Sequence, residues 1–167
     1  SNDKNLFTAY DGSQFNSRLI EKVVALFAEQ DIYLTNKLAA KFGARAERST
    51  RLNKTNLAPR ISLAYKLGKQ SQASLAYGIF YQNPELRYQP ALNPLLFMKA
   101  THYIAQYQKT TSLTTLRLEV FYKKYNNLVK TKNINGRELA NNNNGYGDAS
   151  GFELFWRDKK TVKNLDY

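Results

Sequence analysis

The chain has 167 residues, 43% of them hydrophobic and 13% aromatic, and its 25 Lys and Arg against 13 Asp and Glu give a formal net charge of +12. The absence of cysteine excludes disulfides, zinc ribbons and thiol nucleophiles, and no run of about 20 apolar residues is present for a transmembrane helix. Basic residues are spread along the chain without a recognised nucleic-acid motif, so we expect no nucleic-acid partner despite the charge.

Alternation of apolar and polar residues predicts about eight long strands in one domain, residues 22–167. Residues 1–21 show no strong period and are expected to be an N-terminal arm or loop. The first strand is ambiguous, because its start also fits a helix that Ser17 would cap, whereas its β-branched residues favour a strand. The predicted strands are 22–34, 38–48, 57–67, 72–82, 100–109, 114–125, 146–157 and 161–167.

The connections between these strands differ in length. Residues 35–37, 68–71, 110–113 and 158–160 are predicted as tight turns, and they alternate with longer segments rich in Asn, Pro and Gly, which are 49–56, 83–99 and 126–145. Alternate connections of an antiparallel meander emerge at opposite ends. All short turns are therefore expected at one end and all long loops at the other, which is typical of outer-membrane barrels.

The strand pattern also predicts which face meets lipid. Most of the strands approach the nine to eleven residues or so that a tilted membrane-spanning strand needs. Every second residue of a strand shares one face, and we call such a set a parity. On the apolar parity, aromatic residues lie near both strand ends and predict two girdles of aromatic side chains at the membrane interfaces. These aromatics are Tyr65, Tyr81, Tyr103, Tyr107, Tyr122 and Trp156. The partner of this face is predicted to be the lipid bilayer of the outer membrane.

Nearly all strand-borne charges fall on the opposite parity. A Lys or Arg facing lipid at mid-depth costs about 2 to 4 kcal/mol, whereas one facing a watery lumen costs little. We therefore predict a lumen lined by these charges, where they can contact a ligand. The lumen residues are Lys41, Arg45, Glu47, Arg60, Lys66, Arg117, Glu119, Lys123, Glu153 and Arg157.

Two other functions fit the same alternation. One is a soluble β-barrel that binds a small apolar ligand in its centre and buries the apolar face inward. The other is a basic β-sheet that binds single-stranded nucleic acid by stacking bases on tyrosines. Monodispersity without detergent would favour the first, and steeply salt-dependent oligonucleotide binding would favour the second.

No catalytic or metal constellation is evident. His102 is the single histidine, so metal ligation lacks companions. Glu119 and Glu153 resemble an acid/base pair, but basic residues of the same parity favour ion pairs instead. We predict no enzyme activity and no cofactor. Three glycines of the charged parity, Gly43, Gly78 and Gly151, are expected to bend strands rather than to clear space for a plug or ligand.

Ligand selection is expected in the long loops, because loops carry recognition on a rigid scaffold. Arg87, Tyr88 and Phe97 are the candidate outer-loop contacts. The run NNNNGYGD that begins at Asn141 is rich in turn-forming residues and is predicted to be mobile.

Several segments resemble the later barrel strands of TonB-dependent outer-membrane receptors, particularly the Bacteroidetes type. They are LAPRISLAYKL, LAYGIFYQNPELRY, NPLLFMKATHYIAQYQ, LRLEVFYKKYNNLV and GFELFWRDKK, and the resemblance covers roughly residues 23–167. It implies a large barrel of about twenty-two strands that is plugged by an N-terminal domain. Such receptors import a scarce ligand (siderophore, cobalamin, glycan or peptide) with energy delivered by the TonB system.

The chain shows about eight strands and neither a plug nor a TonB box. We therefore expect a segment of the barrel wall that cannot transport alone, with the TonB system acting through a plug domain absent from this chain. Two strand edges would be left unpaired, and unpaired edges recruit partners. The isolated segment is expected to self-associate through them or to close on itself.

Overall fold

The computed structural model describes residues 2–8, 14–20, 22–85, 88, 93–134 and 136–158, without side chains for 2–20, 137 and 138. Within these residues, every helix or strand element longer than one residue is a β-strand. The strands are β1 (Asn2–Thr8), β2 (Gln14–Ile20), β3 (Val23–Tyr33), β4 (Leu38–Ser49), β5 (Lys54–Lys66), β6 (Ser71–Gln82), β7 (Met98–Thr110), β8 (Thr114–Ile134) and β9 (Arg137–Asp158).

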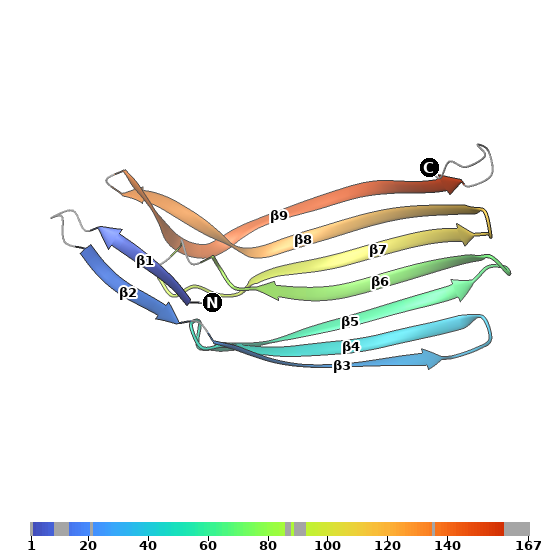
Figure 1. The fold of residues 1–167 in the computed structure, drawn as a ribbon, viewed down its shortest axis with the longest axis horizontal. Helices are drawn as coiled ribbons and strands as arrows, with labels where there is room; N and C mark the ends of the chain where they lie inside the picture. Colours follow the sequence, from blue (N-terminus) through green and yellow to red (C-terminus); the bar gives the residue numbers. More distant parts are fainter. Residues whose placement is uncertain are drawn as a thin grey trace.

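Strands β3 to β9 form one antiparallel sheet in which every strand pairs with its neighbours in sequence (Figure 1). The predicted all-β meander is confirmed, and β3 is a strand rather than a helix. Seven of the eight predicted strands are present in the described residues, and the eighth, 161–167, lies outside them. Connections 34–37, 67–70 and 111–113 share one end of the sheet, here called the turn end. The opposite end is called the loop end.

The two faces of the sheet differ in chemistry. Side chains alternate between faces along a strand, and the register places Leu63 opposite Leu75, and Ala105 opposite both Leu75 and Val120. We call the face that carries these residues the apolar face and its reverse the polar face. Leu63, Leu75 and Leu154 are 39%, 61% and 61% exposed. These leucines therefore do not converge on a sealed centre, as a soluble barrel would require.

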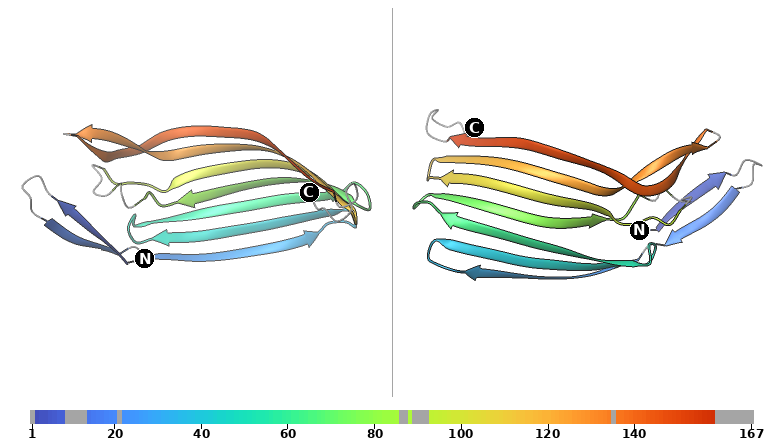
Figure 2. Two further views of the ribbon diagram at one scale, coloured as in Figure 1. Left: turned by 45° about the horizontal axis from the view of Figure 1, so that its top comes forward. Right: turned by 180° about the vertical axis from the view of Figure 1, so that it is seen from behind.

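The loop end differs from the prediction. Residues 126–145 were predicted to be a long irregular loop, but β8 and β9 continue as a paired hairpin through most of it. The run NNNNGYGD lies within β9, so it is a strand rather than the turn-rich segment that was predicted. Register shifts after Tyr125 bend this hairpin away from its neighbours (Figure 2), and Asn127 adopts φ of 56°, which Asn tolerates better than most residues. Only residues 50–53 connect β4 to β5, so that loop is also shorter than predicted.

A small core orders the loop end. The side chain of Asn143 accepts a hydrogen bond from the Leu96 N–H (2.8 Å) and donates to the carbonyls of Leu96 (3.2 Å) and Asn127 (2.9 Å). Asn93 donates to the Asn141 carbonyl (2.7 Å). These bonds tie residues 93–97 to the β8–β9 hairpin. The buried residues of this region are Pro84, Leu95, Phe97, Ala140 and Asn143.

Residues before Ile20 also differ from the prediction. Residues 1–21 were expected to form an N-terminal arm or loop. Instead, β1 and β2 pair over seven residues each as a separate two-stranded hairpin. The pairing register joins Asn2 to Ile20 and Thr8 to Gln14. Backbone pairing does not require an apolar alternation, so two strands can pair here without a strong period in the sequence.

Two glycines of the polar face make room for phenylalanine rings. A Cβ on Gly151 would lie 2.5 Å from Phe121 Cζ, and one on Gly78 would lie 3.0 Å from Phe80 Cε2. The space at these glycines is thus filled by a ring from the same sheet. Neither strand bending nor clearance for a plug is needed to explain their small size.

We expect Gly151→Ala to destabilise the protein by about 1 to 3 kcal/mol, because the added methyl group overlaps the Phe121 ring. Gly147→Ala is the matched control on the same strand, since a Cβ there has no atom within 4 Å. Denaturant unfolding of both variants measures the difference. Equal stability of the two variants would show that the ring yields without cost.

Candidate functional site

The register places all ten predicted lumen residues on the polar face. Lys41, Arg45 and Glu47 alternate along β4, and the rows of paired residues carry the same face across the sheet to β9. The polar face is thus where the strand-borne charges gather.

Two ion pairs join described residues of this face. Lys41 Nζ lies 3.4 Å from Asp31, and Arg45 reaches Glu47 through Nη2 at 3.0 Å. Glu119 and Glu153 were predicted to pair with basic neighbours. Within the described part of the chain neither carboxylate has a basic nitrogen within 4.0 Å, so that prediction is wrong.

Basic side chains on this face instead lie against aromatic rings. The guanidinium carbon of Arg60 is 4.7 Å from the centre of the Phe80 ring, and that of Arg117 is 5.4 Å from the Phe155 ring. Lys123 Nζ is 4.5 Å above the Phe121 ring. A cation over a ring face is attracted by the ring quadrupole. These contacts hold the cations in place without neutralising them.

The densest group of this kind crosses β5 to β8. Arg60, Gly78, His102 and Lys123 occupy one row of the register. Gly78 has no side chain, and the Phe80 ring lies over it and beside the His102 ring, with ring centres 4.5 Å apart. We call Arg60, Phe80, His102, Phe121 and Lys123 the basic–aromatic cluster.

A hollow of about 200 Å³ opens beside this cluster. Arg60, Phe80 and His102 border it from one side, and Lys41 and Glu29 border it from the other. Fixed cations beside flat rings can bind an anion that carries a planar group. Within the described residues no group of three or more His, Cys, Asp or Glu could hold a metal ion.

Phe80 and Phe121 were not among the predicted site residues. The sequence did place them on the charged parity, but it could not show which cation each ring meets. That requires the register between strands: Arg60 lies opposite Gly78, and only then is Phe80 recognised as its diagonal neighbour. His102, the single histidine of the sequence, lies on the polar face between Gly78 and Lys123.

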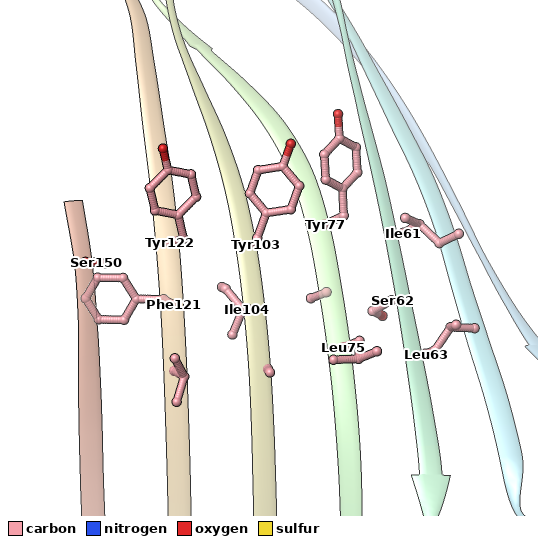
Figure 3. A pocket seen from close by; sticks show the side chains of 13 residues that line it. Ile61, Ser62, Leu63, Leu75, Tyr77, Tyr103, Ile104, Phe121, Tyr122 and Ser150 are labelled. Carbon is pink, nitrogen blue, oxygen red and sulfur yellow. The ribbon is translucent and has the colours of Figure 1, made fainter. Parts of the chain in front are cut away.

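All six predicted interface aromatics lie on the apolar face, and a seventh, Tyr77, joins them. Tyr77, Tyr103 and Tyr122 form one row, with ring centres 5.2 Å apart for the first pair and 6.1 Å for the second. Figure 3 shows their three hydroxyl groups pointing the same way along the strands, toward the loop end. Tyr65 and Tyr107 share a second row through Ala73, nearer the turn end.

The three candidate outer-loop contacts have different positions. Arg87 lies outside the described residues. Tyr88 is half-buried, and its N–H donates to the Glu85 carbonyl at 3.1 Å. Phe97 is 5% exposed, and its ring and the Tyr81 ring form a T-shaped pair with centres 6.1 Å apart. Its side chain thus packs within the loop end.

Comparison with protein families places this sheet among known folds. The family described as "TonB dependent receptor-like, beta-barrel" matches residues 1–167, the whole chain. The chain belongs to this TonB-dependent receptor family. A search of curated proteins found no match.

Solved structures agree with the fold of TonB-dependent receptors. A point mutant of the ferric enterobactin receptor PfeA of Pseudomonas aeruginosa shares 16% identity at a TM-score of 0.75, over 93% of this chain and 27% of the receptor. The siderophore receptor PirA of the same organism shares 18% identity at a TM-score of 0.71, over 90% of this chain and 30% of the receptor. The alcaligin receptor FauA of Bordetella pertussis shares 14% identity at a TM-score of 0.69, over 87% of this chain and 28% of the receptor. The chain therefore spans less than a third of each structure and has the fold of a barrel segment.

The described residues contain no helix that is long and apolar enough to cross a membrane.

Proposed function

We propose that this chain forms part of the barrel wall of an outer-membrane receptor that imports a scarce ligand. One observation supports this most strongly: seven consecutive strands separate an exposed apolar face from a face that carries most of the strand-borne charges. Such a sheet is stable when hydrocarbon covers the first face and water covers the second. The soluble barrel fits less well, because the described chain would have to cover the apolar face with a second layer, and that face is exposed. The nucleic-acid alternative also fits less well, because most of the strand-borne cations lie on the face opposite the tyrosine rows.

The spacing of the aromatics supports a membrane position. Tyr81 lies eight residues along β6 from Ala73, which is opposite Tyr107. That separation is about 26 Å along the strand and, at a tilt of about 40°, about 20 Å of height, close to the apolar band of about 25 Å in outer-membrane barrels. The apolar face therefore has a suitable height to cross the membrane with aromatics near both surfaces.

For the ligand, we propose an anionic iron chelate with planar groups. The solved relatives are named as receptors for ferric enterobactin, siderophores and alcaligin. The basic–aromatic cluster offers complementary chemistry: Arg60 and Lys123 supply charge, and Phe80 and His102 supply flat surfaces. This chain would contribute only part of the passage.

We expect Arg60→Ala, in the full-length receptor, to raise the half-saturating concentration for uptake of radiolabelled iron chelates about tenfold. A hydrogen bond to a charged group contributes about 1.5 to 3 kcal/mol, which corresponds to at least that factor. Arg60→Lys should retain part of the effect, because it keeps the charge but loses the bidentate geometry.

Lys69→Ala provides the control, since Lys69 is an exposed cation in the β5–β6 turn, at the opposite end of the sheet from the loops. It should leave uptake unchanged. Uptake should also stop in cells that lack TonB. If Arg60→Ala and Lys123→Ala both transport like the parent receptor, the cluster does not lie on the ligand path.

A further inference from the structure

A continuous apolar groove runs along the apolar face. Its upper part, about 610 Å³ in volume, has walls formed by Ile61, Leu63, Leu75, Tyr77, Tyr103 and Tyr122. A second depression of about 570 Å³ continues it toward the turn end and shares Leu63, Leu75, Ala105 and Val120 with the first. The small side chain of Ala105, opposite Leu75 and Val120, keeps the middle of the groove open.

The groove is long enough for part of an extended hydrocarbon chain. From Tyr103 to Tyr107, near its two ends, four residues of β7 span about 13 Å. Its lining is almost entirely apolar, and the side chains that form it are largely exposed, with Leu75 at 61% and Val120 at 56%. A groove of this form orients one acyl chain parallel to the strands.

Polar groups mark the loop end of the groove. The hydroxyls of Tyr77, Tyr103 and Tyr122 point toward it (Figure 3). Beyond them on the same face lie two cations: Lys124, two residues past Tyr122, and Lys99, four residues before Tyr103. These two positions are diagonal neighbours on adjacent strands, about 7 to 8 Å apart.

The two cations are available to a ligand. Lys124 is exposed and Lys99 is half-buried, and among the described residues neither has a carboxylate within 4.0 Å. Asp148 is directly opposite Lys124 in the register and reduces the local positive charge without forming an ion pair. The order along the face is therefore hydrocarbon groove, hydroxyl row, then cations.

We propose that this groove is a specific binding site for an anionic, phosphate-bearing lipid of the leaflet on the loop side. One acyl chain occupies the groove, the tyrosine hydroxyls donate to the lipid's ester oxygens, and Lys99 and Lys124 bind its phosphate. Charge complementarity selects this occupant over a neutral lipid, because a phosphate fits the two unpaired ammonium groups. The site rests on the proposed membrane orientation but is separate from ligand import, since it lies on the opposite face from the basic–aromatic cluster.

Native mass spectrometry of the full-length receptor tests the site with two probes, lipid A and its dephosphorylated form. The parent receptor should retain lipid A preferentially. The double variant Lys99→Gln and Lys124→Gln should lose that preference, and Asp148→Asn should strengthen it. Ala105→Phe, which fills the groove, should weaken retention of both lipids.

A charge-matched control is Lys130→Gln with Lys132→Gln, two exposed cations farther out on β8. It should keep the preference for lipid A. Equal loss of the lipid A preference in both double variants would mean that net charge, and not this site, causes the preference. An unchanged preference in the Lys99 and Lys124 variant would refute the proposed site. Failure of the membrane orientation itself would appear differently: the parent receptor would retain neither lipid.

Discussion

We expect Leu75→Arg to lower the stability of the membrane-inserted receptor by about 2 to 4 kcal/mol. Leu75 lies on the central strand β6, in the aliphatic row between the two tyrosine rows of the apolar face. If hydrocarbon surrounds this position, a guanidinium there must be desolvated or must draw water into the bilayer. Urea unfolding of the full-length receptor in lipid vesicles measures the loss.

The size of this stability loss distinguishes lipid from water outside the sheet. Leu75 is 61% exposed, and a surface substitution in a soluble protein usually changes stability by no more than about 0.5 kcal/mol. Ser74→Arg is the matched control, because Ser74 precedes Leu75 and faces the polar side, where charge is tolerated. A Leu75→Arg variant as stable as Ser74→Arg would refute the lipid-facing assignment.

The central sheet could be predicted because its signal is local. Strands β4 to β6 alternate apolar and polar residues along much of their length, and a single-residue slip would move each of their leucines to the other face. The parity of the charges follows from the same rule. For this reason all ten predicted lumen residues share one face, although the function of that face remains our proposal.

The loop end and the partners of the charges depend on contacts between distant residues. Asn-rich segments have low strand propensity, so the sequence predicted a loop where β8 and β9 continue. Asn143 accepts a hydrogen bond from the N–H of Leu96, far away in the sequence, and no local sequence pattern predicts that contact. Likewise, Glu119 was predicted to pair with a cation, but the cations Arg117 and Lys123 lie over phenylalanine rings that only the strand register brings near them.

We expect Asn143→Ala to destabilise the loop end by about 2 to 4 kcal/mol. Asn143 is 8% exposed and makes three hydrogen bonds to backbone groups of Leu96 and Asn127. Its removal takes this partner from three backbone groups in a poorly hydrated region. The expected loss corresponds to one or two groups that water does not reach, at about 1 to 3 kcal/mol for each. Hydrogen exchange of the Leu96 amide should accelerate about 30-fold or more.

The exposed neighbour Asn144 supplies the control, since Asn144→Ala shortens a side chain of the same type on the same strand. It should leave exchange at Leu96 unchanged. Amides in the middle of β6 should exchange alike in both variants, because the sheet pairs independently of the loop core. Protection of Leu96 that survives Asn143→Ala would mean that the apolar contacts of Leu95 and Phe97 alone order residues 93–97. Acceleration that spreads through β6 would instead mean that the loop core and the sheet unfold as one unit, so that ligand-binding loops could not move without loosening the wall beneath them.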